Sequence, residues 1–268
     1  NVIWISSSKN NKKIQVYSSG IKNNKFYSNL TIEKEQKLIM KDKYLLVFEK
    51  NINYVDLLEK LEKFERLDKY ATVNFGMQLR NRQIYENDVV KGRDNLTEFH
   101  KECYTGKDIN QYVVNYNELY CYFNREAKCG GCWDEEIHFS RPKILVRQIG
   151  RTPIAGIDVK GFAVLNTAFM IVNKSNNVDL FTLLGIINSK LTSFFWTNKF
   201  LDDRGQFPKI KGNYLKLLPV PNITKSETIA ENINQIISLK KQGQDTSDLE
   251  NQIDRMVYDL YELTEEEK

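Results

Sequence analysis

The chain has 268 residues, of which 41% are hydrophobic and 28% are charged. A chain of this length and composition can bury a substantial core, which excludes an intrinsically disordered protein. No apolar run approaches the length that spans a membrane, and four cysteines are too few for a disulfide scaffold, so we expect a globular protein of the reducing cytoplasm without a membrane partner. Because the first residues are already strand-like and no Met precedes them, we also expect a piece of a longer protein.

The charges are unevenly distributed along the chain. The net charge of +4 hides a basic middle part, residues 141–222, with 12 Lys and Arg against 4 Asp and Glu, and an acidic end, residues 223–268, with 5 against 11. Sign asymmetry of this kind points to a polyanionic partner. Lysine-rich loops that only keep the surface soluble are the alternative.

The first part of the chain predicts strands followed by one helix. Two β-rich runs, "NVIWISS" and "KKIQVYSS", flank a polar stretch and predict a hairpin, and "KYLLVF" at 43–48 predicts another strand. In residues 53–67 the apolar side chains of Leu57, Leu58, Leu61 and Phe64 share one helical face, with Glu and Lys opposite. This spacing predicts an amphipathic helix.

A polar cluster follows a predicted strand that ends at Gly76. It contains Gln78, Arg80, Arg82 and Gln83. Arg, Asn and Gln pair bidentately with guanine and adenine edges, and each good pair contributes roughly 1–3 kcal/mol of discrimination between bases. These four residues are therefore candidate readers of base sequence, and a solvated polar turn is the alternative.

Further cations lie in turns beside predicted strands. Lys107 lies in a turn before a β-rich run, and a strand expected at 143–149 has Arg147 and Arg151 on either side of its end. Lys and Arg side chains suit phosphate groups. These three residues are therefore candidate phosphate contacts.

The last part of the chain predicts a buried strand at 161–173 and then three helices. Residues 178–200 have the apolar spacing of one helix, for which Asp179 or Asn177 is the expected N-cap. Residues 227–241 and 248–267 predict a pair of amphipathic helices that pack on a partner surface.

A basic loop, "DDRGQFPKIKGNYLKLLPVP" at 202–221, lies between these helices. Its glycines allow close approach of the backbone to a partner. Arg204, Lys209 and Lys211 suit phosphates, and Arg204 or Gln206 could instead reach a base edge. The apolar ending of the loop predicts an anchor in the core.

Catalytic motifs are absent from the sequence. There is no Gly-x-Gly pair for a phosphate loop, no His-rich metal spacing and no Gly-x-Ser-x-Gly, so we assign no catalytic or metal-binding residue. The one candidate metal motif is "CGGC", Cys129 to Cys132, which could form a four-thiolate zinc site with Cys103 and Cys121. Because a second close pair of cysteines is missing, a glycine turn without metal is the preferred interpretation.

Several blocks of the sequence, taken in order, resemble a known family. They are "KFERLDKYATVNFGMQ", "TGKDI", "RPKILVRQIG", "LLGIINSKLTSFFW", "LKLLPVP" and "DRMVYDLYELTEEE". Their order resembles the C-terminal target-recognition region of TaqI-type adenine-specific DNA methyltransferases, including those fused into single-chain restriction–modification enzymes. The resemblance extends from about Asp56 to the end of the chain.

The resemblance implies an α+β fold with three parts. A mixed β-rich DNA-recognition domain with amphipathic helices would span 56–222, a helical segment would span 223–268, and residues 1–55 would be the tail of a catalytic domain. The partners implied are double-stranded DNA and the catalytic methyltransferase domain of the same chain.

The resemblance also assigns methyl transfer to that catalytic domain, which binds S-adenosylmethionine. The Asn/Asp-Pro-Pro-Tyr/Phe tetrapeptide that carries this chemistry does not occur in these residues, so no cofactor is expected here. A glycine-threonine-glycine motif is replaced by "MQLRNRQ" after "NFG", so the family's base preference cannot be transferred. Two alternatives are a specificity subunit of a multi-subunit restriction system and a protein-interaction module without a DNA role.

Overall fold

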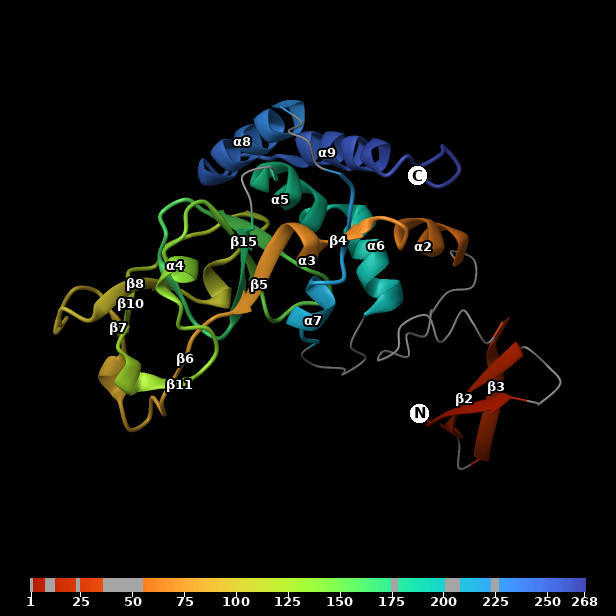
Figure 1. Ribbon diagram of the computed structural model, residues 1–268, viewed down its shortest axis with the longest axis horizontal. Coiled ribbons are helices and arrows are strands. Elements are labelled where there is room, and N and C mark those ends of the chain that lie inside the picture. The colour runs from red at the N-terminus through yellow and green to blue at the C-terminus, as the bar shows by residue number, and fades with distance from the viewer. Residues whose placement is uncertain are drawn as a thin grey trace. The chain divides into compact units, whose positions relative to one another are not determined.

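The computed structural model describes residues 2–7, 13–22, 25–35, 55–174, 178–200, 208–222 and 227–268. These residues form two compact units, Asn1–Asp56 and Leu57–Lys268 (Figure 1). Strands and helices are both abundant, and the strands are mostly antiparallel. The α+β class predicted from the sequence is confirmed.

The first unit contains a three-stranded antiparallel sheet. In spatial order its strands are β1 (Val2–Ser7), β2 (Lys13–Lys22) and β3 (Lys25–Glu35). The hairpin predicted from the first two β-rich runs is confirmed by the pairing of β1 with β2. The strand expected at 43–48 lies outside the described residues.

A five-stranded sheet forms the centre of the second unit. In spatial order its strands are β5 (Ala71–Phe75), β15 (Ala168–Asn173), β12 (Lys143–Arg147), β13 (Ala155–Asp158) and β9 (Tyr112–Val113). The first four pair antiparallel, and β9 joins in parallel. Arg147 pairs with Ala168, and Phe169 pairs with Phe75, so these residues share one end of the sheet.

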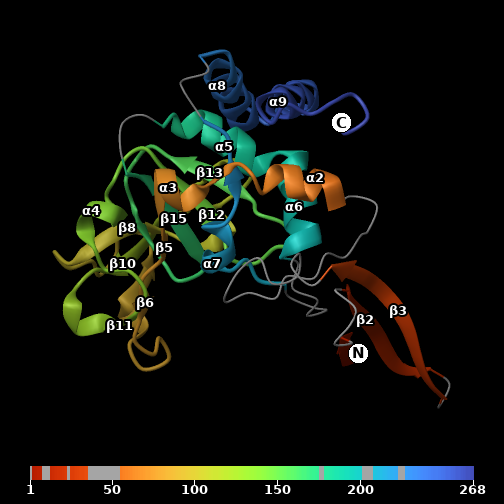
Figure 2. The same ribbon diagram turned by 45° about the vertical axis from the view of Figure 1, so that its right-hand side comes forward.

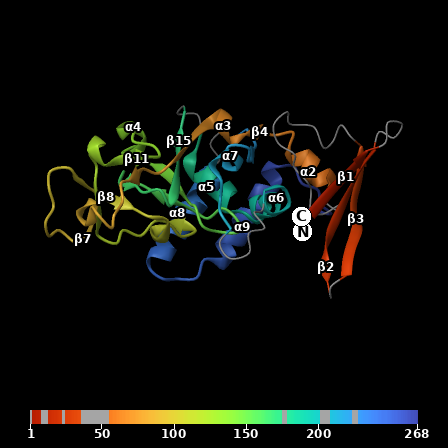
Figure 3. The ribbon, with the colours of Figure 1, turned by 90° about the horizontal axis from the view of Figure 1, so that it is seen from below.

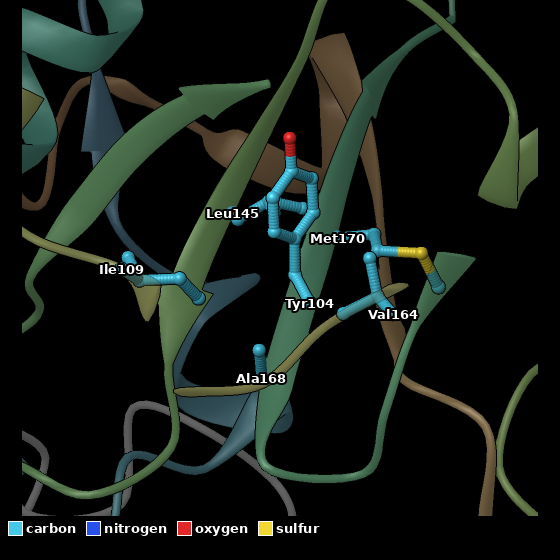
Figure 4. Close-up of a cluster of buried hydrophobic side chains, with 6 residues drawn as sticks. All are labelled: Tyr104, Ile109, Leu145, Val164, Ala168 and Met170. Carbon is cyan, nitrogen blue, oxygen red and sulfur yellow. The ribbon is translucent and has the colours of Figure 1, made fainter. Parts of the chain in front are cut away.

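The middle strands of this sheet are buried on both faces. Ile144, Leu145 and Val146 of β12 have no exposed surface, as expected for a continuous apolar run in a covered sheet. Figure 4 shows the cluster around Leu145, which also contains Tyr104, Ile109, Val164, Ala168 and Met170. Such a close-packed interior gives the turns at the strand ends a rigid support.

A four-stranded sheet and a strand pair complete the β structure of this unit. The sheet has the order β14 (Ala163–Val164), β8 (His100–Tyr104), β10 (Leu119–Tyr122) and β7 (Val89–Lys91), and the pair is β11 (Lys128–Gly130) with β6 (Gln78–Leu79). The single strand expected at 161–173 is wrong, because the chain turns after β14. The Thr167 N–H donates to the Leu165 carbonyl at 2.7 Å, and β15 then enters the central sheet.

The helix expected at 178–200 is two helices, α5 (Leu180–Asn188) and α6 (Lys190–Lys199). Ser189 separates them, since its backbone is extended and its hydroxyl accepts a backbone N–H of α6 as an N-cap. The Asn188 side chain holds the end of α5 on the sheet through hydrogen bonds to both the N–H and the carbonyl of Ala155. At the start of α5, Asp179 is the observed N-cap, and Asn177 lies outside the described residues.

The predicted pair of C-terminal helices is present as α8 (Glu227–Lys241) and α9 (Ser247–Leu260), and both contact α5. Gly185 of α5 permits the close approach, because a Cβ there would lie 3.2 Å from Cδ1 of Ile233 and 3.3 Å from Cγ2 of Ile253. Figures 1 and 2 show α8 and α9 on one side of the unit and the short helix α7 (Gly212–Leu215) on the other. Among the described residues, no helix is long and apolar enough to cross a membrane.

The helix predicted at 53–67 is shorter than expected. α2 covers Val55–Leu61, and β4 (Glu65–Arg66) and α3 (Leu67–Tyr70) follow it. Leu58 and Leu61 are buried, as the amphipathic pattern predicted. The helix stops because Glu65 and Arg66 pair with another strand, and this tertiary pairing overrides local helix propensity.

The apolar ending of the basic loop forms β16 (Pro219–Val220), which pairs with β4. This pairing anchors the loop in the core, as predicted. The Leu67 N–H donates to the Leu218 carbonyl at 2.8 Å, and the Tyr261 hydroxyl donates to the Pro219 carbonyl at 2.6 Å. This short segment is therefore held by residues from both ends of the second unit.

A buried histidine joins the "CGGC" segment to β14. His138, the last residue of α4 (Glu135–His138), has no exposed surface. Its Nδ1 accepts the Val164 N–H at 3.1 Å, and its Nε2 donates to the Cys132 carbonyl at 2.9 Å. This pattern requires a neutral ring, and burial lowers the pKa of His138 to about 4.

The low pKa of His138 predicts a loss of stability in acid. Between pH 6.5 and about 4 the unfolded chain binds a proton at His138 that the folded chain does not. The histidine's contribution is therefore complete above pH 6.5 and falls by about 1.4 kcal/mol per pH unit as the pH decreases toward 4. Urea unfolding near neutral pH and in mild acid should show a shallower pH dependence for His138→Gln than for the unmodified protein. Equal pH dependences would contradict the prediction.

Candidate nucleic-acid interface

The end of β12 pairs with the described part of the basic loop. The Gly150 N–H donates to the Pro208 carbonyl at 3.1 Å, and the Ile210 N–H donates to the Gln148 carbonyl at 2.8 Å. Lys209, between these two bonds, forms a bridge with Ile149. The turn that carries Arg147 and Arg151 and the loop that carries Lys209 are therefore neighbours.

A third segment reaches the same end of the sheet. Lys107 lies in the 3-10 turn Gly106–Asp108, which is closed by reciprocal hydrogen bonds between Thr105 and Asp108. The Gly106 N–H donates to Oγ1 of Thr167 at 2.8 Å, and a Cβ at Gly106 would lie 3.4 Å from Cγ of Arg147. The exposed Lys107 thus projects from a turn that contacts Arg147.

Five of the cations predicted to contact phosphate belong to these three segments. We refer to Lys107, Arg147, Arg151, Lys209 and Lys211 as the cationic cluster. All are exposed except Arg147, which is half-buried and donates from Nε to the Ile149 carbonyl. Within the part of the chain that the structure describes, no carboxylate forms an ion pair with any of the five. Their charges are therefore available to an anionic partner. Arg204 and Gln206 lie outside the described residues.

An open groove of about 510 Å³ lies beside the cationic cluster. Its apolar lining residues include Phe75 and Phe169, whose ring centroids are 5.0 Å apart. Its other lining residues are mainly polar or basic: Gln148, Lys209, Lys211, Asn213 and Lys216. The site prediction had omitted Gln148, Asn213 and Lys216, although Gln148 directly follows Arg147 and Lys216 belongs to the same basic loop.

The turn after β6 contains the other predicted site residues. Arg80 is engaged inside the protein, since its Nε and Nη2 donate to the two carboxylate oxygens of Asp88 at 2.9 and 3.0 Å. Its guanidinium also lies 3.7 Å from the ring centroid of Tyr85. The Asp88 carboxylate raises the pKa of Arg80 further above its ordinary value. Arg80 therefore supports this turn from within.

Asn81 shapes the same turn. Its carbonyl accepts the N–H groups of Ile84 and Tyr85, both at 3.0 Å, and its side-chain oxygen accepts the N–H of Gln83 at 3.0 Å. Arg82 and Gln83 are exposed as a result, and Gln78 is exposed on β6. Three of the four predicted base readers are thus accessible, whereas Arg80 is paired internally.

The turn after β6 and the groove are joined by one strand. β5 places Phe75 in the groove and continues through Gly76 into β6. In Figures 1 and 2, β6 and α7 both lie on the side of the unit that is away from α8 and α9, and Figure 3 views the molecule from this side. A single extended ligand on this side could therefore contact both regions.

The four cysteines are not brought together. Cys103 and Cys121 are buried in an apolar cluster with Met77, whereas Cys129 is exposed on β11. Burial, with the Cys121 thiol beside it, raises the pKa of Cys103, so this residue is packed as a thiol. Within the described residues no group of three or more His, Cys, Asp and Glu side chains could hold a metal ion. Gly131 has a φ of +70°, so the "CGGC" segment contains a glycine turn.

Sequence comparison assigns the class of this domain. Residues 101–220, which contain the turn of Lys107, the end of β12 and the basic loop, match the sequence model of a specificity domain. The matching family is the TaqI-like C-terminal specificity domain. The resemblance found in the sequence is confirmed.

Two solved structures are also similar to the chain. One is a chain from a type I restriction–modification system, studied for its complex assembly and conformational transition, with 11% identity, a TM-score of 0.42 and coverage of 74% of this chain and 44% of that chain. The other is the HsdS subunit from Thermoanaerobacter tengcongensis, with 12% identity, a TM-score of 0.40 and coverage of 78% and 50%. The chain thus spans about half the length of these solved chains.

Proposed function

We propose that the second unit recognises DNA sequence for a restriction–modification system. The observation that carries this proposal is the convergence of the cationic cluster, in which three segments far apart in sequence bring five cations to one end of the central sheet. The match to the TaqI-like C-terminal specificity domain over residues 101–220 supports it. The partner is double-stranded DNA.

The two regions of the site have different roles in this proposal. The cationic cluster contacts phosphates, together with Arg204, and this fixes the position of the domain on the duplex. Gln78, Arg82 and Gln83 contact base edges, while Arg80 holds the turn that presents them. Gln206 contacts either a base edge or a phosphate.

The resemblance to adenine-specific methyltransferases extends the proposal to the parent protein. We propose that a catalytic domain of the same chain binds S-adenosylmethionine and methylates adenine in the cytoplasm, and that the present residues direct it to its site. Formation of N6-methyladenine in duplex DNA incubated with the parent protein and S-adenosylmethionine is the measurement for this part. A parent protein that binds a specific duplex but leaves its adenines unmethylated would contradict it.

Binding to duplex DNA should weaken steeply with salt. Six phosphate contacts, five from the cationic cluster and one from Arg204, predict a slope of about −5 to −6 in a plot of the logarithm of the association constant against that of the salt concentration. Replacing Lys209 and Lys211 by Ala should reduce the magnitude of this slope by about two, for all duplex sequences alike. Fluorescence anisotropy with labelled duplexes over a range of salt concentrations measures both quantities.

The matched control removes two lysines from the opposite side. Lys190 lies at the start of α6 near Asp254 of α9, and Lys241 is an exposed residue at the end of α8. Lys190→Ala with Lys241→Ala changes the net charge equally but should leave the salt slope unchanged. Equal effects of the two double variants would mean that binding follows net charge alone, and would remove the cationic cluster from the interface.

A further inference from the structure

The turn after β6 exposes an isoleucine. Ile84 is 71% exposed, the largest value among the exposed large hydrophobic residues in the described part of the chain. Burial of such a side chain normally stabilises the folded state, so a fixed exposed position is unusual for an isoleucine. A single exposed apolar residue needs no explanation by itself, and the structure of its turn decides the question.

The position of Ile84 is determined by hydrogen bonds. Its own N–H donates to the Asn81 carbonyl, and the neighbouring Gln83 N–H donates to the Asn81 side chain. The next residue, Tyr85, packs against the guanidinium of Arg80, which Asp88 holds through two hydrogen bonds. Asp88 itself is 3% exposed. The isoleucine is thus presented on a turn that is attached to a buried carboxylate.

The surroundings of Ile84 indicate the chemistry of its partner. Arg82 and Gln83 precede it and are exposed, and the exposed Lys128 lies opposite Leu79 on the neighbouring strand. A protein-binding surface would offer a broader apolar patch. On this turn only Ile84 and the neighbouring Tyr85, which is 42% exposed and packs its ring against Arg80, present apolar surface. A patch this small beside hydrogen-bond donors instead matches a row of base edges in the major groove, where the only apolar group is the thymine C5-methyl.

We propose that Ile84 packs against the C5-methyl group of a thymine in the recognised sequence and is a specificity-determining residue. This inference rests on the proposed function, since it requires that the second unit binds DNA. Gln83 and Arg82, on the same turn, contact purines of the same or adjacent base pairs. Ile84 therefore discriminates thymine through contact area, whereas its neighbours discriminate through hydrogen bonds.

The test combines a protein variant with a change of one methyl group in the DNA. The preferred duplex of the parent protein is first selected from a randomised pool, and each thymine is then replaced singly by uracil, which lacks only the C5-methyl. At one position uracil should weaken binding of the unmodified protein roughly four-fold, the ratio that corresponds to burial of one methyl group. Ile84→Ala should bind the thymine duplex less tightly and should bind thymine and uracil duplexes equally at that position.

The control variant is Val159→Ala. Val159 is 54% exposed and lies in the turn after β13, outside the site, so its variant should discriminate thymine from uracil as the unmodified protein does. If no thymine position is sensitive, or if Ile84→Ala retains full discrimination, the inference is wrong while DNA binding stands. If the unmodified protein shows no salt-dependent duplex binding, the proposed function fails and the inference fails with it.

Discussion

Replacing Lys143 by Met should lower the free energy of unfolding by about 3–5 kcal/mol, because it leaves a buried carboxylate without its counter-ion. Lys143 Nζ lies 2.5 Å from Oδ2 of Asp158, and neither side chain has exposed surface. Burial lowers the pKa of Lys143, and the Asp158 carboxylate opposes this change. Once Lys143 is removed, Asp158 keeps its backbone hydrogen bonds but has no cationic partner among the described residues.

The same carboxylate also holds the turn between β13 and β14. Its Oδ1 accepts the N–H groups of Lys160 and Gly161 at 2.8 and 3.0 Å, and its Oδ2 accepts that of Phe162 at 3.1 Å. Replacing both partners of a buried ion pair by apolar residues is often nearly neutral. Here, Lys143→Met with Asp158→Leu would leave three backbone N–H groups without their acceptor, so the double variant should still lose at least about 2 kcal/mol.

Urea unfolding followed by circular dichroism measures these losses. Lys241→Met is the matched control, because this lysine is exposed at the end of α8 and its replacement should change stability by less than about 0.5 kcal/mol. A loss below about 1 kcal/mol for Lys143→Met would mean that water or a rearranged turn compensates Asp158.

Gly131→Ala should be the most damaging single glycine substitution in the "CGGC" segment. Gly131 has a φ of +70°, which costs a residue with a Cβ about 1–2 kcal/mol. The added Cβ would lie 2.1 Å from the carbonyl oxygen of Gly76, and a Cβ on Gly76 would in turn lie 2.2 Å from that of Leu165. Three backbone segments therefore pack in direct contact at this point. Displacing one of them to make room for a Cβ should lower the free energy of unfolding by a further amount of about 1–3 kcal/mol.

Gly92→Ala is the control that separates the two costs. Gly92 has a φ of +81°, but a Cβ there would meet no atom within 4 Å. Gly92→Ala should therefore show only the backbone cost, and Gly131→Ala should exceed it by about 1–3 kcal/mol in urea unfolding. Equal losses of unfolding free energy in the two variants would show that the backbone segments around Gly131 move apart without strain. Gly131→Ala should also reduce base discrimination. Gly131 packs against Gly76 and Gln78, and the turn that carries Arg82, Gln83 and Ile84 follows Gln78 closely in the sequence.

Local signals in the sequence predicted the helix α8 and the N-cap of α5. α8 was predicted with its observed bounds, since its isoleucines recur at helical spacing and no residue within 227–241 stops the helix. Asp179 was among the expected N-caps because its carboxylate can accept N–H groups two and three residues on. Both signals depend on residues within one or two turns.

Features that depend on distant partners could not be read in this way. The break at Ser189 is fixed partly by Ala155 of β13, which binds the adjacent Asn188. The groove exists because Phe75 and Phe169 are neighbours in the sheet, and strand pairing of this separation has no local signature. The cations were predicted from residue type and turn position, but their convergence follows from the pairing of Lys209 with Ile149.

Arg80 illustrates a limit of inference from residue type. The sequence marked it as a base reader together with Arg82, since the guanidinium suits guanine. In the structure the guanidinium of Arg80 is held by Asp88 and Tyr85, whereas Arg82 is exposed. This difference in exposure is what distinguishes the two arginines. The exposed Ile84 was overlooked because apolar residues are usually taken as core candidates.

The hydrogen bond from Tyr261 to Pro219 has a practical consequence for exchanging specificities between relatives. A chimera with its junction near residue 222 would transfer the basic loop and β16 without Tyr261, which donates a hydrogen bond to β16. The recipient protein would then have to supply another donor in place of the Tyr261 hydroxyl. Junctions outside Leu57–Lys268 keep the basic loop, β16 and Tyr261 of the donor protein together. The whole second unit is therefore the segment to exchange.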